Sequence, residues 1–203
     1  MSQLEWIAET PALRVRQQIE WTEVLTGYEM QNRYVIDDGH ERFTLHAGEV
    51  SRGLSGLFWR QVLQSKRPFL VQIMATGSVV LEVVRPWRWF FSRAEVRDPR
   101  GAPIGSIQQR FAWLQRHYVL EDPHGRVLAD LWGPFFKPWT FEIRERGRKL
   151  GTIRKRWSGL GKETFTGADN FSLDFSPGLD KTVRTLCMCA TILIDYIHFS
   201  RKK

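Results

Sequence analysis

The feature that most limits the possible folds is a nearly uninterrupted apolar segment at residues 182–199, which reads TVRTLCMCATILIDYIHF. Wound as an α-helix, it places its few polar residues on one narrow stripe, because their spacings of seven, four and three residues return to the same face. These residues are Arg184, Thr191, Asp195 and His198. A helix that is apolar over the rest of its surface is typical of a protein core or of a membrane span.

A core helix is the better interpretation of this segment. Its uncharged run, residues 185–194, contains ten residues, whereas a bilayer requires roughly 20. Asp195 at the membrane centre would cost about 2.5–3.5 kcal/mol. Ser176 and Pro177 predict the helix start, as an N-cap hydroxyl followed by proline at the first helical position. The rest of the chain must then supply a shell around the helix.

Short β-strands and turns follow one another through the chain before this helix. Leu13, Val15 and Gln17 alternate with arginines and predict a first strand. Five turn signals follow, each flanked by apolar, β-rich runs, and they predict five hairpins. The turns lie at residues 37–39, 75–77, 98–101, 122–125 and 146–147.

One hairpin occurs twice. Residues 86–111 and 134–157 resemble each other, and Gly105 in the first corresponds to Gly151 in the second at an offset of 46. These glycines predict strand positions that another backbone or the central helix approaches closely. About a dozen antiparallel strands and one apolar helix predict a mainly β fold, a closed barrel around a central C-terminal helix. We expect a lead-in at residues 1–11 and one barrel domain at residues 12–203.

Composition narrows the functional classes. The hydrophobic fraction of 42% and nine Trp predict a folded chain. The net charge of +8 favours an anionic partner: a phospholipid surface, an acidic protein or, on charge alone, a nucleic acid. Cys187 and Cys189 would point to nearly opposite sides of the helix, which predicts small core residues in a reducing compartment. The N-terminal residues lack a secretory signal pattern, so secretion is not expected.

No catalytic constellation is evident. The five histidines show no metal-ligand spacing, and the sequence contains no nucleophile elbow, P-loop or G-x-G-x-x-G motif. Asp195 with Arg184 or His198 is better interpreted as a buried polar set than as an acid–base pair. We therefore expect neither an enzyme nor a small-molecule substrate.

Several stretches, taken together, resemble the phospholipid scramblase family, which is related to Tubby-like and plant LURP-one-related proteins. They are LRVRQ (13–17), VVRP (83–86), GAPIGSIQQ (101–109), GTIRKRWSGLGKE (151–163), FTGADNF (165–171) and LIDY (193–196). The resemblance covers residues 12–200 and implies a twelve-stranded Tubby-like barrel threaded by a hydrophobic helix. It also implies association with the cytoplasmic side of the plasma membrane and calcium-stimulated, energy-independent movement of phospholipids in both directions.

The chain departs from animal scramblases in two respects. A long proline-rich N-terminal region is missing from this sequence. The cysteine cluster that becomes palmitoylated in those proteins corresponds to residues 87–92, which contain no cysteine here. Lipid anchoring by that route is therefore excluded.

The resemblance also implies a calcium loop at residues 167–180. Asp169, Asn170 and Asp180 match the family pattern, and Asp174 is an additional acid. Calcium binds six to eight oxygens, so four side chains would form a weak site. The alternative interpretation is a half-buried strand, because Phe171, Leu173 and Phe175 alternate with polar residues.

Two connections mix large aromatic residues with cations. The residues that we expect to contact lipid are Trp87, Arg88, Trp89, Phe90, Phe91, Phe136, Lys137 and Trp139. Aromatic rings and cations together are typical of a membrane interface. We predict that both connections lie at one end of the barrel and enter the bilayer surface, and the alternative is that the rings pack under the barrel mouth.

A basic hairpin is the third candidate site. Its anion-binding candidates are Arg144, Arg146, Arg148, Lys149, Arg154 and Arg156. They could bind phosphoinositide headgroups, as Tubby-like domains do, or a nucleic-acid backbone. The alternative is a solvated strand face. Overall, the sequence favours phospholipid scrambling, and the second hypothesis is a module that binds anionic lipid or a protein partner without moving lipid.

Overall fold

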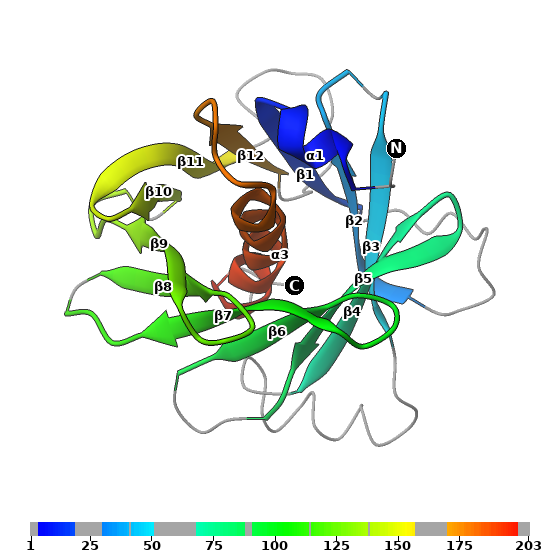
Figure 1. The fold of residues 1–203 in the computed structure, drawn as a ribbon, viewed down its shortest axis with the longest axis horizontal. Coiled ribbons are helices and arrows are strands. Elements are labelled where there is room, and N and C mark those ends of the chain that lie inside the picture. Colours follow the sequence, from blue (N-terminus) through cyan, green and yellow to red (C-terminus); the bar gives the residue numbers. More distant parts are fainter. Residues whose placement is uncertain are drawn as a thin grey trace.

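The structure, a computed structural model, describes residues 4–18, 30–40, 42–50, 68–87, 91–113, 115–137, 139–156 and 170–198. Within these residues twelve strands form a closed antiparallel barrel, and α3 (Lys181–His198) runs through it (Figure 1). The predicted fold is therefore confirmed. The strands are β1 (Ala12–Gln18), β2 (Met30–Asp37), β3 (Thr44–Val50), β4 (Phe69–Ala75), β5 (Ser78–Arg85), β6 (Arg93–Arg97), β7 (Pro103–Arg110), β8 (Arg116–Glu121), β9 (Val127–Gly133), β10 (Thr140–Glu145), β11 (Arg148–Arg156) and β12 (Asn170–Phe175).

The barrel closes between its first and last strands. Leu13 on β1 lies opposite Leu173 on β12, and every other neighbouring pair is consecutive in the sequence. Closure leaves no unpaired strand edge. All five predicted hairpins are present, and in the β10–β11 turn Arg146 and Gly147 both have positive φ, at 48° and 81°. Two-residue hairpin turns of type I′ require positive φ at both central residues.

The two glycines of the sequence repeat occupy equivalent places in the wall. A Cβ atom at Gly105 would lie 2.5 Å from the Glu121 carbonyl oxygen and 2.9 Å from Leu186 Cδ1 on α3. A Cβ atom at Gly151 would meet the Asp174 carbonyl oxygen on β12. The prediction that another backbone or the central helix approaches these glycines is thus confirmed.

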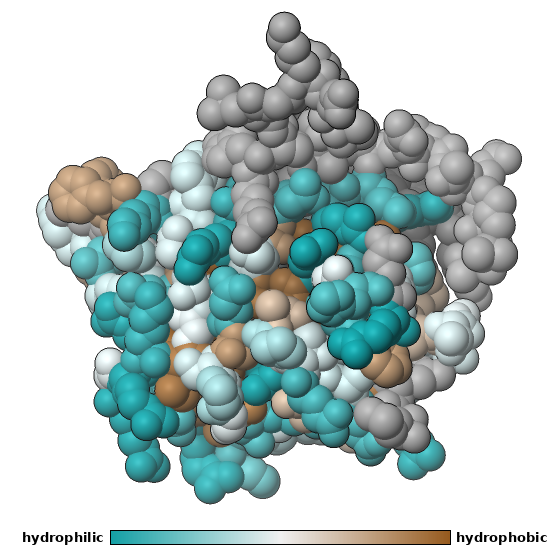
Figure 2. Space-filling model, turned by 90° about the horizontal axis from the view of Figure 1, so that it is seen from above, coloured by the Kyte–Doolittle hydropathy of each residue, from teal (hydrophilic) through white to brown (hydrophobic). Residues whose placement is uncertain are grey.

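The core lies between the barrel wall and α3. Inward residues alternate along each strand, as with Val71 and Ile73 on β4, and they pack with fully buried residues of α3 such as Leu186 and Met188. The face of the molecule drawn in Figure 2 is mostly hydrophilic. Burial raises the pKa of the Cys189 thiol to about 12, consistent with the predicted core role.

The predicted lead-in at residues 1–11 is not loose in its described part, residues 4–11. They contain α1 (Trp6–Glu9), and Trp6 and Ile7 are buried in the same core as the strands. Arg184 on α3 is also buried and donates hydrogen bonds to the carbonyl oxygens of Thr10, at 2.5 Å, and Ile7, at 3.4 Å. The segment is ordered because its backbone oxygens solvate this buried guanidinium, a long-range contact with no local sequence signal.

The helix also begins later than predicted. Asp180, not Ser176, is its N-cap: Asp180 Oδ1 accepts hydrogen bonds from the backbone N–H groups of Thr182, at 2.7 Å, and Val183. The Ser176 N–H instead donates to the Leu150 carbonyl on β11. Ser176 therefore continues the strand contact, and the chain turns before the helix starts.

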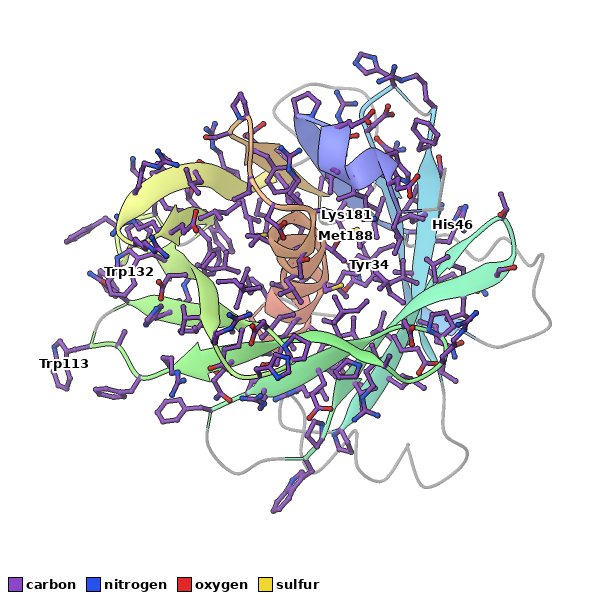
Figure 3. All side chains as sticks on the ribbon, viewed as in Figure 1. Tyr34, His46, Trp113, Trp132, Lys181 and Met188 are labelled. Atoms are coloured by element: carbon purple, nitrogen blue, oxygen red, sulfur yellow. The ribbon has the colours of Figure 1, made fainter. Side chains whose placement is uncertain are left out.

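The polar stripe of α3 divides into separate contacts. Asp195 Oδ2 accepts a hydrogen bond of 2.7 Å from the hydroxyl of Tyr34, which points from β2 toward the helix (Figure 3). The Thr191 hydroxyl donates to the Cys187 carbonyl. Arg184 lies about 16 Å from Asp195 along the helix, at 1.5 Å per residue, so of the two predicted partners of Asp195 Arg184 is wrong. The side chain of His198, the other one, lies outside the described part of the structure.

Candidate functional site

Exposed aromatic side chains lie at one end of the barrel and form what we call the aromatic rim. They come from the β5–β6, β7–β8 and β9–β10 loops, which share one end because consecutive strands are antiparallel. The rim residues are Trp87, Phe91, Phe111, Trp113, Phe135 and Phe136. Phe136 is 92% exposed and Trp113 is 79% exposed, and Trp113 projects away from the barrel in Figure 3. Such exposure of large apolar residues marks an interaction surface.

Contacts between rings hold parts of the rim together. Phe91 and Phe111, from different loops, meet edge to face with centroids 6.3 Å apart. Phe135 and Phe136 make a similar contact at 5.5 Å. The first of these contacts joins the β5–β6 and β7–β8 loops, and the second lies within the β9–β10 loop. It lies at the end where α3 finishes, because Tyr196 packs on Phe69, the first residue of β4.

The charges beside the rim are cationic. The sequences of the three loops, residues 86–92, 111–115 and 134–139, contain no Asp or Glu. Lys137 is exposed, whereas Arg93 and Arg110 each form an ion pair of 3.0 Å with Glu121. Two arginines thus share one carboxylate, so these three described side chains together carry a net positive charge.

A second layer of cations lies inside the barrel below the rim. Arg85 is buried, and its guanidinium lies 5.6 Å from the Phe69 ring centroid. Arg116 lies 4.8 Å from the Phe141 ring, and burial lowers its pKa. Lys155 lies between the rings of Trp139 and Phe171, at 5.5 and 5.6 Å. Aromatic faces therefore stabilise each of these cations.

The predicted lipid-contact residues divide into three groups. Trp87, Phe91, Phe136 and Lys137 are exposed at the predicted end. Trp139 is half-buried over Lys155, as the packing alternative anticipated. Arg88, Trp89 and Phe90 lie outside the described residues. The sequence reasoning did not assign Phe111, Trp113 and Phe135 to the site, although a search of every loop at this end for aromatics would have found them.

The basic hairpin candidates do not form one patch. Arg144 and Lys149 both contact Glu142, at 2.6 and 3.5 Å, and Arg146 and Arg148 are exposed at the turn opposite the aromatic rim. Arg154 lies on the outer wall, 4.0 Å from Asp174. The side chain of Arg156 lies outside the described part of the structure.

The described calcium candidates do not converge. Asn170 and Asp174 are four residues apart on β12, about 13 Å at the rise of an extended strand, so one ion would not contact both. Asp180 caps α3, and Asp169 lies outside the described residues. Within the described ranges no three His, Cys, Asp or Glu side chains gather as a metal site. Calcium binding therefore stays a prediction.

The fold and the rim together define a class of protein: a Tubby-like barrel filled by its own C-terminal helix and carrying an interface-type aromatic surface at one end. In the described part of the chain, no helix has both the length and the apolar character needed to cross a bilayer. The Scramblase family model matches residues 1–201, and the chain belongs to this family.

Curated relatives agree with this assignment. The chain is 30% identical to phospholipid scramblase 1 of Mus musculus over 213 residues, covering 98% of this chain and 64% of that protein. It is 27% identical to phospholipid scramblase 2 of Homo sapiens, covering 98% and 71%. It is 26% identical to human phospholipid scramblase family member 5, covering 97% and 76%. No solved structure matches this chain.

Proposed function

We propose that this protein binds the surface of an anionic phospholipid membrane through its aromatic rim and promotes energy-independent movement of phospholipids between the leaflets. The aromatic rim carries the proposal. Its rings are exposed, its loops contain no acidic residue, and cations lie beside it. Trp and Phe beside Lys and Arg partition to the headgroup region of anionic bilayers. The relatives named phospholipid scramblase support the second half of the proposal.

The position of α3 limits how lipid could move. The helix is buried inside the barrel, and its residues 183–196 have little or no exposed surface. It therefore fills the core and offers no surface along which a headgroup could slide. In our proposal the rim enters one leaflet and disturbs its packing, so that lipids cross beside the protein. The protein would accordingly act peripherally, on the cytoplasmic side of the membrane.

The filled barrel also favours a second candidate function, a module that binds anionic lipid or a protein partner without moving lipid. Reconstitution into vesicles with a fluorescent lipid separates the two. Dithionite quenches only outer-leaflet lipid, so quenching beyond half, in the presence of protein, supports scrambling. Quenching that stops at half, while the protein still co-sediments with anionic vesicles, supports the binding module. Absence of both effects would overturn both proposals.

Calcium stimulation is a finer proposal that rests on the family resemblance alone. The same assay with and without calcium tests it. Replacing Asp169 with Asn should remove any stimulation, whereas Asp174→Asn should leave it unchanged, because Asp174 is too far along β12 from Asn170 to bind the same ion.

A further inference from the structure

An open cleft of about 220 Å³ lies on the outer wall of the barrel, across β8, β9 and β10. It is lined by His117, Asp130, Trp132, Arg144 and Gly147. Trp132 is half-buried and lies on the wall, away from α3 (Figure 3). The cleft is smaller than the roughly 300–1,000 Å³ of sites for drug-sized ligands. It would therefore suit a molecule of few heavy atoms.

Opposite charges face each other across this cleft without pairing. Asp130 and Arg144 are Cα partners on β9 and β10. The Asp130 carboxylate nevertheless contacts His117 Nε2 at 2.6 Å, and Arg144 bonds to Glu142 through Nε and Nη2, at 3.0 and 2.6 Å. Each charged group is thus held by another side chain, Asp130 by His117 within the cleft and Arg144 by Glu142 on the same strand. The remaining hydrogen-bonding edges of Asp130 and Arg144 are left for a ligand between them.

An aromatic side chain completes the arrangement. His117 meets Trp132 edge to face with centroids 4.8 Å apart, and the Arg144 guanidinium lies 5.9 Å from the Trp132 ring. The indole therefore lies in contact with both the His117 imidazole and the Arg144 guanidinium. One face of the ring already stabilises the Arg144 guanidinium, which is well suited to phosphate oxygens. The indole ring can also attract a second cation.

We infer that this cleft binds a zwitterion in which a primary ammonium group lies a short distance from a phosphate. The ammonium would donate to Asp130 and lie against Trp132, and the phosphate would accept hydrogen bonds from Arg144. A primary ammonium fits better than a quaternary one, because its N–H groups can donate hydrogen bonds to the Asp130 carboxylate. A quaternary ammonium is typically bound by a cage of several aromatic rings, and the cleft has a single indole. Such a zwitterion occurs as a lipid headgroup and as a free phosphorylated amine.

The direct test is an NMR titration of the full chain with O-phosphoethanolamine that follows the indole N–H signal of Trp132. This signal is assigned as the one that is missing from the spectrum of Trp132→Phe. A saturable shift is expected. Asp130→Asn and Arg144→Gln should each weaken the binding about tenfold or more, equivalent to the loss of one charged contact. Arg100→Gln removes an exposed charge from the β6–β7 turn, outside the cleft, and should leave the affinity unchanged. Arg144→Lys keeps the positive charge but loses the paired N–H donors of the guanidinium, so it should weaken binding less than Arg144→Gln.

Two controls define the outcomes that would overturn the inference. Phosphocholine presents the same phosphate with a quaternary ammonium, and binding as tight as that of phosphoethanolamine would refute recognition of the amine. Inorganic phosphate should bind more weakly than phosphoethanolamine, and equal affinity would refute the zwitterion. Absence of any saturable shift would also refute the site.

Vesicles distinguish the two sources of the ligand. A Trp132 shift with phosphatidylethanolamine vesicles, absent with pure phosphatidylcholine vesicles, assigns the cleft to a lipid headgroup. A shift with the soluble compound alone assigns it to a free phosphorylated amine. The result is separable from the proposed function, because a rim variant that no longer binds vesicles should still bind soluble phosphoethanolamine.

Discussion

The hydroxyl of Tyr34 on β2 donates a hydrogen bond of 2.7 Å to Asp195 Oδ2 on α3, joining residues that are 161 positions apart. Both residues are at most 1% exposed. The bond ties the barrel wall to the central helix at a place where both side chains are shielded from bulk solvent. It therefore fixes the rotation of the helix as well as stabilising it.

We expect Tyr34→Phe to lower the free energy of unfolding by about 1–3 kcal/mol, the cost of depriving a buried acceptor of its donor. Phenylalanine keeps the ring volume, so packing is unchanged. Denaturant unfolding measures the loss. A double-mutant cycle with Asp195→Asn should give a clear coupling energy, and a coupling near zero would mean that the two residues do not interact in solution.

Arg184 joins α1 to the start of α3 through the carbonyl oxygens of Ile7, Thr10 and Ser176. Replacing it with Met should cost about 2–4 kcal/mol, because several buried carbonyls lose a charged donor at once. Thermal unfolding tests this expectation. Lys181→Met removes a charge from the first turn of the same helix and should change stability by less than about 0.5 kcal/mol. Equal effects of the two variants would contradict the role of Arg184.

Replacing exposed aromatic residues of the rim should weaken membrane binding without affecting the fold. Trp113→Ser combined with Phe136→Ser should weaken co-sedimentation with anionic vesicles by tenfold or more. Inserting one large apolar side chain contributes about 1.5–3 kcal/mol, and 1.4 kcal/mol corresponds to a factor of ten. Both side chains are exposed in the fold, so thermal stability should be unchanged.

Val127 provides the matched control for the rim. It is 57% exposed at the start of β9, the end of the barrel opposite the rim. Val127→Ser should leave vesicle binding as in the unmodified protein. If it weakens binding as much as the rim variant does, membrane contact is not confined to the rim.

Glu142 should contribute to the loss of folding stability at acidic pH. The hydrogen bond from Arg144 holds the pKa of Glu142 below its usual value, and nearby Lys149 adds to this effect, although burial opposes it. A carboxylate with a depressed native pKa contributes stability above its unfolded pKa, about 4.3. That contribution is lost as the pH falls through the lower native value.

Glu142→Gln should therefore make the unfolding free energy less dependent on pH below about 4.3. Denaturant unfolding at a series of pH values measures this. Thr140→Ser, at the start of the same strand, changes no titratable group and should leave the dependence as it is. An unaltered pH profile in Glu142→Gln would refute the assignment.

The features of the fold that local chemistry dictates could be predicted from the sequence. Asp-Pro-x-Gly and x-Gly turns mark hairpins, and Gly105 and Gly151 mark close approach between strands. The apolar surface of the predicted helix has to be covered by the rest of the chain. Short alternating strands can cover all sides of a helix only by forming a closed barrel around it. The end of the barrel that carries Trp87 and Phe136 also followed, because alternate loops of an antiparallel meander lie together.

Contacts between distant residues could not be predicted in this way. Trp6 is buried and stacks on Phe43, a residue 37 positions away. Asp180 caps α3 because the Ser176 N–H bonds to the Leu150 carbonyl and the helix starts only beyond it. The cleft at Trp132 needed the register of three strands, since His117, Asp130 and Arg144 have no common spacing in the sequence. The histidines therefore seemed unrelated to any site.

The order of elements along the chain has a consequence for biosynthesis. The wall is translated first, from residue 12 to residue 175, and the helix that fills it comes last. Until α3 leaves the ribosome, the inward faces of twelve strands have no core to pack against, and β1 must wait for β12 to close the ring. The nascent chain therefore exposes apolar strands throughout its synthesis, when it is most prone to aggregate. Folding should begin only after translation of the helix, with chaperones protecting the wall until then.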